Sequence, residues 1–185
     1  TAVQKACGFD DTPEAMAAYL NAITDHPDGA KIARLATGSA DHFDWLEARG
    51  VPFNQTYYPE KNLVPPGPDC LMYSGNEKVW PFRDITPPAP RGHKVAFDGL
   101  DGGGGLILER LVAHAARIGV DVRFDMHVNA LVTDGDRVTG VGVRHFTETL
   151  HFRARRGVVL GGGGFGRNTE MMARYASSFD KATIV

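Results

Sequence analysis

A short apolar run that ends on four consecutive glycines constrains this chain most. Val158-Val159-Leu160 predicts a buried strand, because β-branched runs of this length are typical of strands that are covered on both faces. Gly161–Gly164 follow at once, and backbone without Cβ atoms lets another molecule approach closely. In open α/β sheets, ligands bind outside the carboxyl ends of strands. The glycines are therefore a candidate ligand contact, and the alternative is a tight turn beneath a packed helix.

Composition is that of an ordinary globular protein, with 185 residues, of which 43% are hydrophobic and 23% charged. The formal net charge of -2 gives no indication of nucleic acid or an anionic membrane as a partner, and no apolar run has the length of a transmembrane helix. Cys7 and Cys70 stand far apart, in no metal-ligand spacing, which favours a reducing, cytoplasmic location. Thr1 is not an initiator methionine and no signal-peptide pattern follows it, so we expect a fragment or a processed product.

The segment 12–50 is expected to form two helices. Thr12 supplies a capping oxygen to the first, and apolar residues then recur at three- and four-residue spacing. A Pro-Asp-Gly break at 27–29 precedes the second helix, which has compatible spacing and ends at Gly50. Gly38 lies inside that second helix and could mark a break.

The segment 51–105 is expected to be a long irregular loop. It holds most of the prolines and loses all periodicity, but it keeps aromatic residues that can bury area, which argues against disorder. Such a segment indicates a lid or a substrate-facing loop, and the alternative is a packed loop that covers a sheet edge. Its candidate catalytic residues are Tyr73, which could donate to a substrate carbonyl, and Arg91 and His93, which could polarise a carbonyl or carry a proton. The alternatives are packing for the tyrosine and solvation for the histidine.

The segment 106–168 is expected to hold a helix followed by strands. A glycine run, Gly102–Gly105, opens the helix, and free N–H groups at such a helix start can accept an anion. Gly119 ends the helix. Alternating apolar residues then predict a strand at 120–124 and a three-stranded meander, with a hairpin turn at 134–136.

A final helix is expected over 168–178, with Asn168 as its N-cap. The predicted order inserts the meander between two strands of a parallel sheet. This order resembles the FAD-binding domain of the fumarate reductase and succinate dehydrogenase flavoprotein superfamily. Three motifs carry the resemblance: Val-Asn-Ala-Leu-Val-Thr-Asp at 128–134, Arg-Val-Thr-Gly-Val at 137–141, and Ala-Arg-Arg-Gly-Val-Val-Leu-Gly-Gly-Gly-Gly-Phe at 154–165.

Within that superfamily the chain is most similar to 3-ketosteroid dehydrogenases, and Leu71–Gly75 and Ala89–His93 resemble their Δ4-(5α) group. The resemblance implies an α/β fold: a partial, glutathione-reductase-like, Rossmann-type FAD-binding domain over 1–185, with a three-stranded antiparallel β-meander. It implies hydride transfer from a small-molecule substrate to flavin N5. Two alternatives stay open: an FAD-dependent reductase of fumarate or another enoate, and a non-catalytic fragment that self-associates through an exposed sheet edge and apolar surfaces.

The resemblance also implies where FAD would bind. The implied contacts are Val128 at the adenine, Gly161, Gly162 and Gly163 at the adenosine and pyrophosphate, and the run Gly102–Gly105, with Gly103 and Gly104, near the flavin. The chain departs from the family in having glycine where the family's second turn has threonine, so only backbone contacts are expected there. It also lacks the family's first G-x-G-x-x-G unit and the downstream substrate domain with its catalytic tyrosines. We therefore expect the chain to be an inactive internal part of a flavoenzyme that binds FAD poorly by itself.

Overall fold

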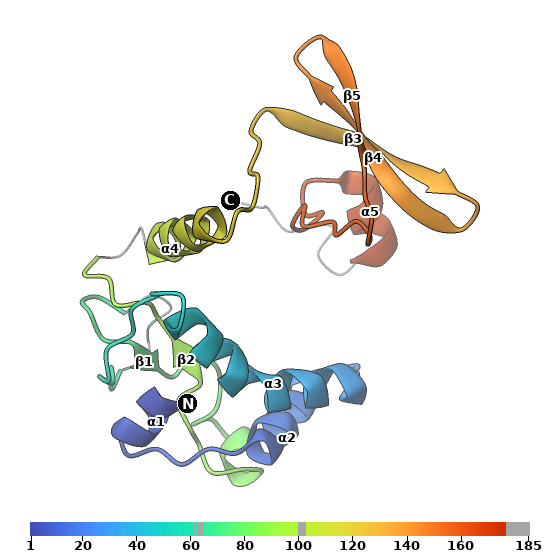
Figure 1. Ribbon diagram of the computed structural model, residues 1–185. Helices are drawn as coiled ribbons and strands as arrows, with labels where there is room; N and C mark the ends of the chain where they lie inside the picture. Colours follow the sequence, from blue (N-terminus) through green and yellow to red (C-terminus); the bar gives the residue numbers. More distant parts are fainter. Residues whose placement is uncertain (61, 63–64, 100–102, 177–185) are drawn as a thin grey trace. The chain divides into compact units, whose positions relative to one another are not determined.

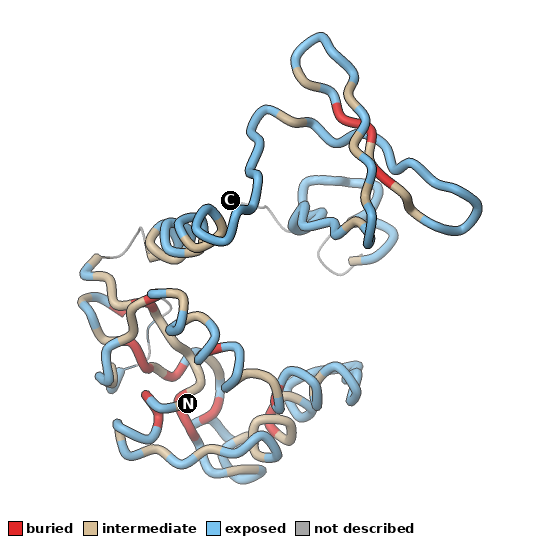
Figure 2. The backbone as a smooth tube through the Cα atoms, viewed as in Figure 1, coloured by how far each residue is buried: buried red, intermediate tan, exposed pale blue. Residues whose placement is uncertain are grey.

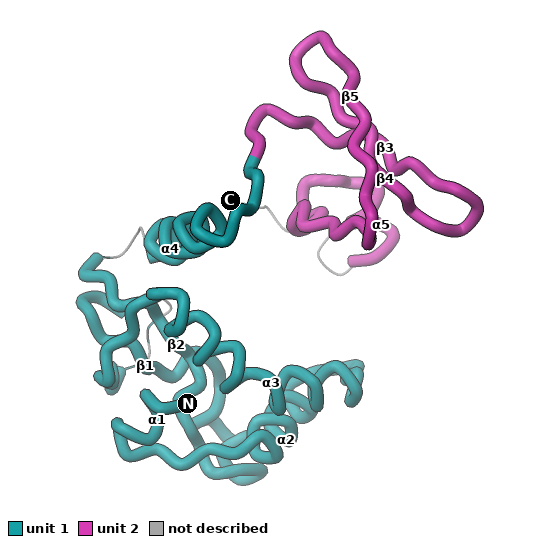
Figure 3. The backbone as a smooth tube through the Cα atoms, viewed as in Figure 1, with its two compact units in different colours: residues 1–122 teal, residues 123–185 magenta. Residues whose placement is uncertain are grey.

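The computed structural model describes residues 1–60, 62, 65–99 and 103–176 (Figure 1). The chain divides into two compact units, residues 1–122 and residues 123–185 (Figure 3). Within the described ranges, unit 1 contains four α-helices and two short strands, whereas unit 2 contains a three-stranded sheet and one α-helix. The expected combination of α and β structure is therefore present.

The two helices expected in the amino-terminal segment are α2 (Pro13–Ile23) and α3 (Gly29–Glu47). The Thr12 side chain caps α2 by accepting a hydrogen bond from the Ala15 amide at 3.1 Å. Helix α3 continues through Gly38, so a break there is not observed. One interior glycine costs a helix only about 1 kcal/mol, and packing of α3 against α2 offsets this.

A short helix at the start of the chain, α1 (Ala2–Ala6), was not expected from the sequence. Its signal is a capping box, in which the Thr1 side chain accepts from the Gln4 amide and the Gln4 side chain reaches back to the backbone of Thr1. Helix α4 (Gly103–Arg117) begins within the glycine run that was predicted to open it. Gly119, with a φ of 80°, ends it in the left-handed conformation that glycine adopts without steric cost.

The segment between α3 and α4 is irregular, as predicted, and it is packed. Its regular elements are the antiparallel pair β1 (Leu71–Met72) and β2 (Gly92–His93), and a 3₁₀ turn, η1 (Phe82–Asp84). Its described residues with little exposed surface include Val51, Cys70, Leu71, Tyr73, Ala89 and Val95. The packed loop is thus a wall of the unit 1 core, which joins Val3, Phe43 and Leu71 (Figure 2).

The predicted meander forms the sheet of unit 2. Strands β3 (Met126–Asp134), β4 (Arg137–His145) and β5 (Glu148–Arg153) pair antiparallel in the order β3-β4-β5. Gly135, with a φ of 57°, sits in the expected hairpin turn between β3 and β4. Asn168 caps the final helix, α5 (Thr169–Tyr175), by accepting from the Met171 amide at 3.0 Å. The end of the predicted helix, residues 177–178, lies outside the described residues.

Two predicted strands are wrong. Residues 120–124 and 158–160 are not strands, and the side chains of Val159 and Leu160 are 95% and 70% exposed rather than buried. The physical reason is that a strand needs a neighbouring backbone for its N–H and C=O groups. Among the described residues, no strand lies beside either segment. The glycines therefore follow an extended, exposed segment in this structure.

Candidate functional site

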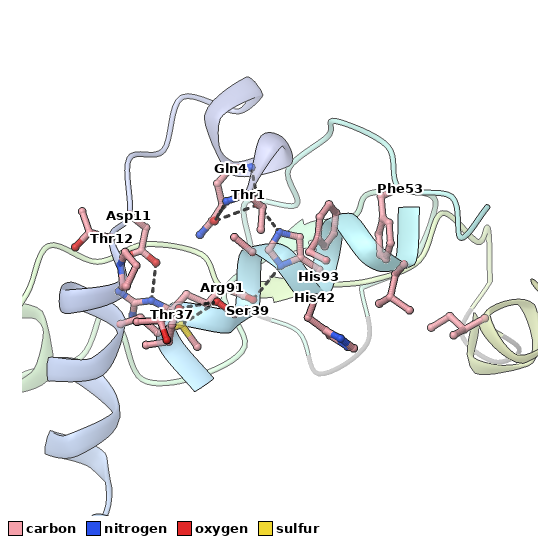
Figure 4. Close-up of a pocket in the computed structure, with 17 residues that line it drawn as sticks. Thr1, Gln4, Asp11, Thr12, Thr37, Ser39, His42, Phe53, Arg91 and His93 are labelled. Carbon is pink, nitrogen blue, oxygen red and sulfur yellow. Dashed lines mark hydrogen bonds and ion pairs between the residues drawn. The ribbon is translucent and has the colours of Figure 1, made fainter. Parts of the chain in front are cut away.

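A cavity of about 320 Å³ lies in unit 1, between α2, α3 and the segment that contains β2 (Figure 4). Its apolar wall includes Met16, Ala36, Phe43 and Leu46. Its polar lining includes Arg91 and His93, two of the three predicted catalytic residues. The structure thus brings these two residues to one concave site with a mostly apolar wall, which is the usual character of a small-molecule pocket.

Arg91 is held by a carboxylate that sequence reasoning did not connect with it. Its Nε and Nη2 donate to Asp11 Oδ2 and Oδ1 at 2.8 and 2.7 Å, and the two side chains are only 10% and 7% exposed. The guanidinium carbon also lies 5.1 Å from the centre of the Tyr19 ring. Nη1 of Arg91 is buried without a hydrogen-bond acceptor. This two-bond pair fixes the guanidinium at the cavity and neutralises its charge locally.

His93 has both ring nitrogens occupied. Nδ1 lies 3.1 Å from the Arg91 carbonyl oxygen, which can only accept, so Nδ1 carries the proton. Nε2 then accepts from the Thr1 hydroxyl at 2.9 Å. Burial lowers the pKa of His93 below its ordinary value, and the bond to the Arg91 carbonyl opposes this only in part. The ring is therefore neutral near pH 7, and a catalytic role for it stays a prediction.

The neutral state of His93 predicts a specific pH dependence of stability. An unfolded histidine binds a proton below its ordinary pKa of about 6.5, whereas the folded ring resists protonation. The contribution of His93 is thus complete above pH 6.5 and is lost as the pH falls below it. In His93→Asn, the decline in the free energy of unfolding between about pH 7 and 5 should be less steep. His42→Asn, at an exposed position, is the control for urea titrations, and an equal slope in the wild type and His93→Asn would contradict the assignment.

Tyr73 does not line the cavity that contains Arg91 and His93. Its hydroxyl donates to the Pro88 carbonyl at 3.2 Å, and its ring packs edge-on against Phe9 and Tyr57. Burial raises the pKa of its hydroxyl. It borders a separate small pocket with Glu77 and Lys78. This packing is the alternative that the sequence left open, and a substrate contact by Tyr73 stays a prediction.

Residues that sequence reasoning missed hold the cavity together. Gln4, only 7% exposed, donates from Nε2 to the Pro90 carbonyl at 2.8 Å, beside the Arg91–Asp11 pair. The capping box at residues 1–4 was the available signal for Gln4. Asp11 and Arg91 are 80 residues apart, and no local pattern connects them.

In unit 2, the predicted cofactor residues have free backbone surface. Val128 lies on β3, an edge strand of the sheet, and the pairing with β4 shifts register between Val128 and Ala130. A Cβ added at Gly161 or Gly162 would meet nothing within 4 Å. Gly163, with a φ of 79°, needs glycine for its backbone conformation. These residues therefore fit a flat, charged nucleotide that approaches bare backbone, although the contacts themselves stay predictions.

The other predicted cofactor residues lie in unit 1. Gly103 and Gly104 form the first turn of α4, where amide groups have no partner within the helix. A Cβ at Gly103 would stand 3.0 Å from Val95 Cγ1, so packing alone explains that glycine. Nothing lies within 4 Å of a Cβ at Gly104. Gly102, which the resemblance also implied, lies outside the described residues.

A single substitution in the run Gly161–Gly164 can show whether its glycines are needed for contact with the cofactor or for folding. Gly161→Ala should change the free energy of unfolding by less than about 0.5 kcal/mol, because its methyl group meets no atom of the chain. If Gly161 approaches FAD closely, the affinity for FAD should fall about tenfold, which is about 1.4 kcal/mol. Titration of the whole protein with FAD by flavin fluorescence measures this. Gly38→Ala, equally free of contacts, is the control, and unchanged FAD affinity in Gly161→Ala would remove Gly161 from the site.

Unit 2 thus has a meander followed by an open glycine turn and a capped helix, and unit 1 has a glycine run that opens a helix. The chain belongs to the FAD binding domain family, whose profile matches residues 2–185. The predicted fold class is thereby confirmed, and FAD is the cofactor of this family. Among the described residues, no helix is both long and apolar enough to cross a membrane.

Known proteins similar to the chain include two steroid dehydrogenases. It is 42% identical to the 3-ketosteroid-Δ4-(5α)-dehydrogenase of Rhodococcus jostii RHA1, solved in complex with 4-androstene-3,17-dione, with a TM-score of 0.91 over 96% of this chain and 38% of that one. It is 39% identical over 74 residues, 40% of this chain and 13% of the relative, to 3-oxosteroid 1-dehydrogenase of Comamonas testosteroni. It is also 27% identical to a flavocytochrome c3 fumarate reductase in its open conformation, with a TM-score of 0.72 over 99% of this chain and 28% of that one.

Proposed function

We propose that the whole protein is an FAD-dependent oxidoreductase that dehydrogenates a 3-ketosteroid. The observation that carries the proposal is the similarity of nearly the whole chain to a ketosteroid dehydrogenase solved with a steroid. The proposal concerns the whole protein, because the chain spans 38% of the length of that relative. FAD, when bound, supplies a hydride acceptor at its N5 atom.

The residues of this chain would serve that reaction by binding and orientation. The glycines at 161–163 and the edge of β3 at Val128 would hold the adenosine and pyrophosphate side of FAD through backbone groups. The first turn of α4, at Gly103 and Gly104, would lie near the flavin. The apolar wall of the unit 1 cavity would offer an uncharged substrate a surface from which water is excluded.

The experiment compares two reactions of the whole protein loaded with FAD. A ketosteroid oxidised with an artificial electron acceptor should give turnover, and fumarate with a reduced dye should give none above background. Activity on fumarate alone would overturn the steroid proposal and favour the enoate reductase. That second candidate is supported by the similarity to the flavocytochrome c3 fumarate reductase.

For the 185-residue chain by itself we propose self-association. The side chains of Phe124, Val159 and Leu160 are 77%, 95% and 70% exposed, and such large exposed apolar groups favour contact with a second copy of the chain. The mass of the purified chain in solution and its visible absorption spectrum test this. A colourless oligomer is expected, and a yellow monomer with a flavin spectrum would overturn it.

A further inference from the structure

We propose that Asp11 is a specificity-determining residue: by pairing with Arg91 it keeps the unit 1 cavity neutral, so that the cavity accepts an uncharged, largely apolar molecule and rejects a dicarboxylate. This inference rests on the proposed function and deepens it. It assigns a place for the substrate and a physical basis for the choice between a ketosteroid and fumarate.

Charge is the first argument. A carboxylate bound in a partly buried site needs a cation of its own, because it gives up its hydration shell. Arg91 is the arginine that lines the cavity, and the Asp11 carboxylate already accepts from its Nε and Nη2 at 2.8 and 2.7 Å, which offsets its charge. His93 is neutral and has both nitrogens occupied.

The wall of the cavity is the second argument. Met16, Phe43, Leu46, Phe53 and Ile107 give it apolar surface from several elements of unit 1 (Figure 4). The volume of about 320 Å³ falls in the range of roughly 300–1,000 Å³ that is typical of small-molecule sites. A fused-ring ketone is uncharged, apolar over most of its surface and of suitable size. A small dicarboxylate would leave the apolar wall uncovered and its own charges unpaired.

Position 40 tests where the ligand binds. Ala40 lines the cavity but is exposed, so a larger side chain there should be tolerated by the fold. Ala40→Phe should weaken binding of 4-androstene-3,17-dione to the whole, FAD-loaded protein about tenfold or more by calorimetry. Ala33→Phe, at an exposed position on the same helix, should leave the affinity unchanged. An unchanged affinity in Ala40→Phe would overturn the placement of the ligand.

The charge of the cavity is tested with three variants and fumarate as the probe. Asp11→Asn frees the Arg91 charge, so fumarate binding should rise about tenfold or more while steroid binding falls. In Asp11→Asn with Arg91→Gln, both changes should disappear because the cavity is neutral again. Ala40→Lys adds an unpaired cation without touching the pair, and it should also gain fumarate binding even where Asp11→Asn fails to fold. No gain in Ala40→Lys and in any folded Asp11→Asn protein would overturn the proposal.

Turnover measured on the same samples separates this inference from the proposed function. If Ala40→Phe oxidises steroid as fast as the wild type, the cavity is not the binding site, but the proposed function still holds. If Ala40→Phe weakens steroid binding but the wild-type protein oxidises no steroid, the cavity is the binding site and the proposed function is wrong.

Discussion

Gly140→Ala is expected to unfold the meander of unit 2. Gly140 lies on β4 opposite Arg153 of β5, and a Cβ there would overlap the Phe152 carbonyl oxygen. It would also stand 3.2 Å from the Phe152 carbonyl carbon and 3.3 Å from the Arg153 Cα. These are backbone atoms, so no side-chain rotation relieves the contact. The strands must separate, and we expect a loss of about 3 kcal/mol in the free energy of unfolding.

The measurement must report on unit 2. Both tryptophans of the chain, Trp45 and Trp80, lie in unit 1, so their fluorescence does not follow the sheet. Far-ultraviolet circular dichroism follows the loss of the sheet during urea unfolding. Gly161→Ala is the control in the same unit, since its methyl group meets no atom of the chain. If the two variants unfolded at the same urea concentration, strand packing at Gly140 would not be the determinant.

Structure that depends on neighbours in sequence was predictable. The caps at Thr12 and Asn168, the helix end at Gly119 and the hairpin turn at Gly135 each rest on contacts within a few residues. The meander followed because each of its strands pairs with the next one along the chain. Such local pairings keep their signal in the sequence.

The two strands that were predicted wrongly depend on contacts that are not local in sequence. The apolar residues at 120–124 and 158–160 have strand composition, but composition cannot supply a partner backbone. The alternation of Val120, Val122 and Phe124 was a correct sign of apolar surface, and these side chains are 50%, 48% and 77% exposed. The periodicity of apolar residues thus predicts which surface is apolar, but it does not predict which part of the protein covers that surface.

The same distinction applies to the candidate site. The motif at residues 89–93 drew attention to Arg91 and His93, and both line the cavity. Their chemical state was not readable, because it depends on contacts across the chain: Asp11 neutralises Arg91, and the Thr1 hydroxyl occupies His93. A free cation and a free base were expected from residue type alone. The structure has a neutralised cation and a neutral ring.

Removal of one partner from the Asp11–Arg91 pair is expected to have the second large effect. The Asp11 side chain is only 7% exposed in the native fold, and Arg91→Ala removes the cation that pairs with it, so its buried carboxylate is strongly disfavoured. Breaking a buried pair in this way costs about 3–5 kcal/mol. We expect the urea midpoint of unit 1, followed by tryptophan fluorescence, to fall accordingly. Lys31→Ala is the control, because its pair with Asp28 is solvent-exposed and should leave the midpoint nearly unchanged.

A double substitution shows whether the pair itself stabilises the fold. Replacing a buried ion pair with apolar side chains of similar volume is often neutral, because the cost of desolvating both charges disappears with them. Asp11→Leu with Arg91→Met should therefore recover most of the stability that Arg91→Ala loses. Such recovery would mean that folding does not require the pair, and the neutral cavity of the double variant should still discriminate between steroid and fumarate. A double variant as unstable as Arg91→Ala would instead make the pair a structural requirement of unit 1.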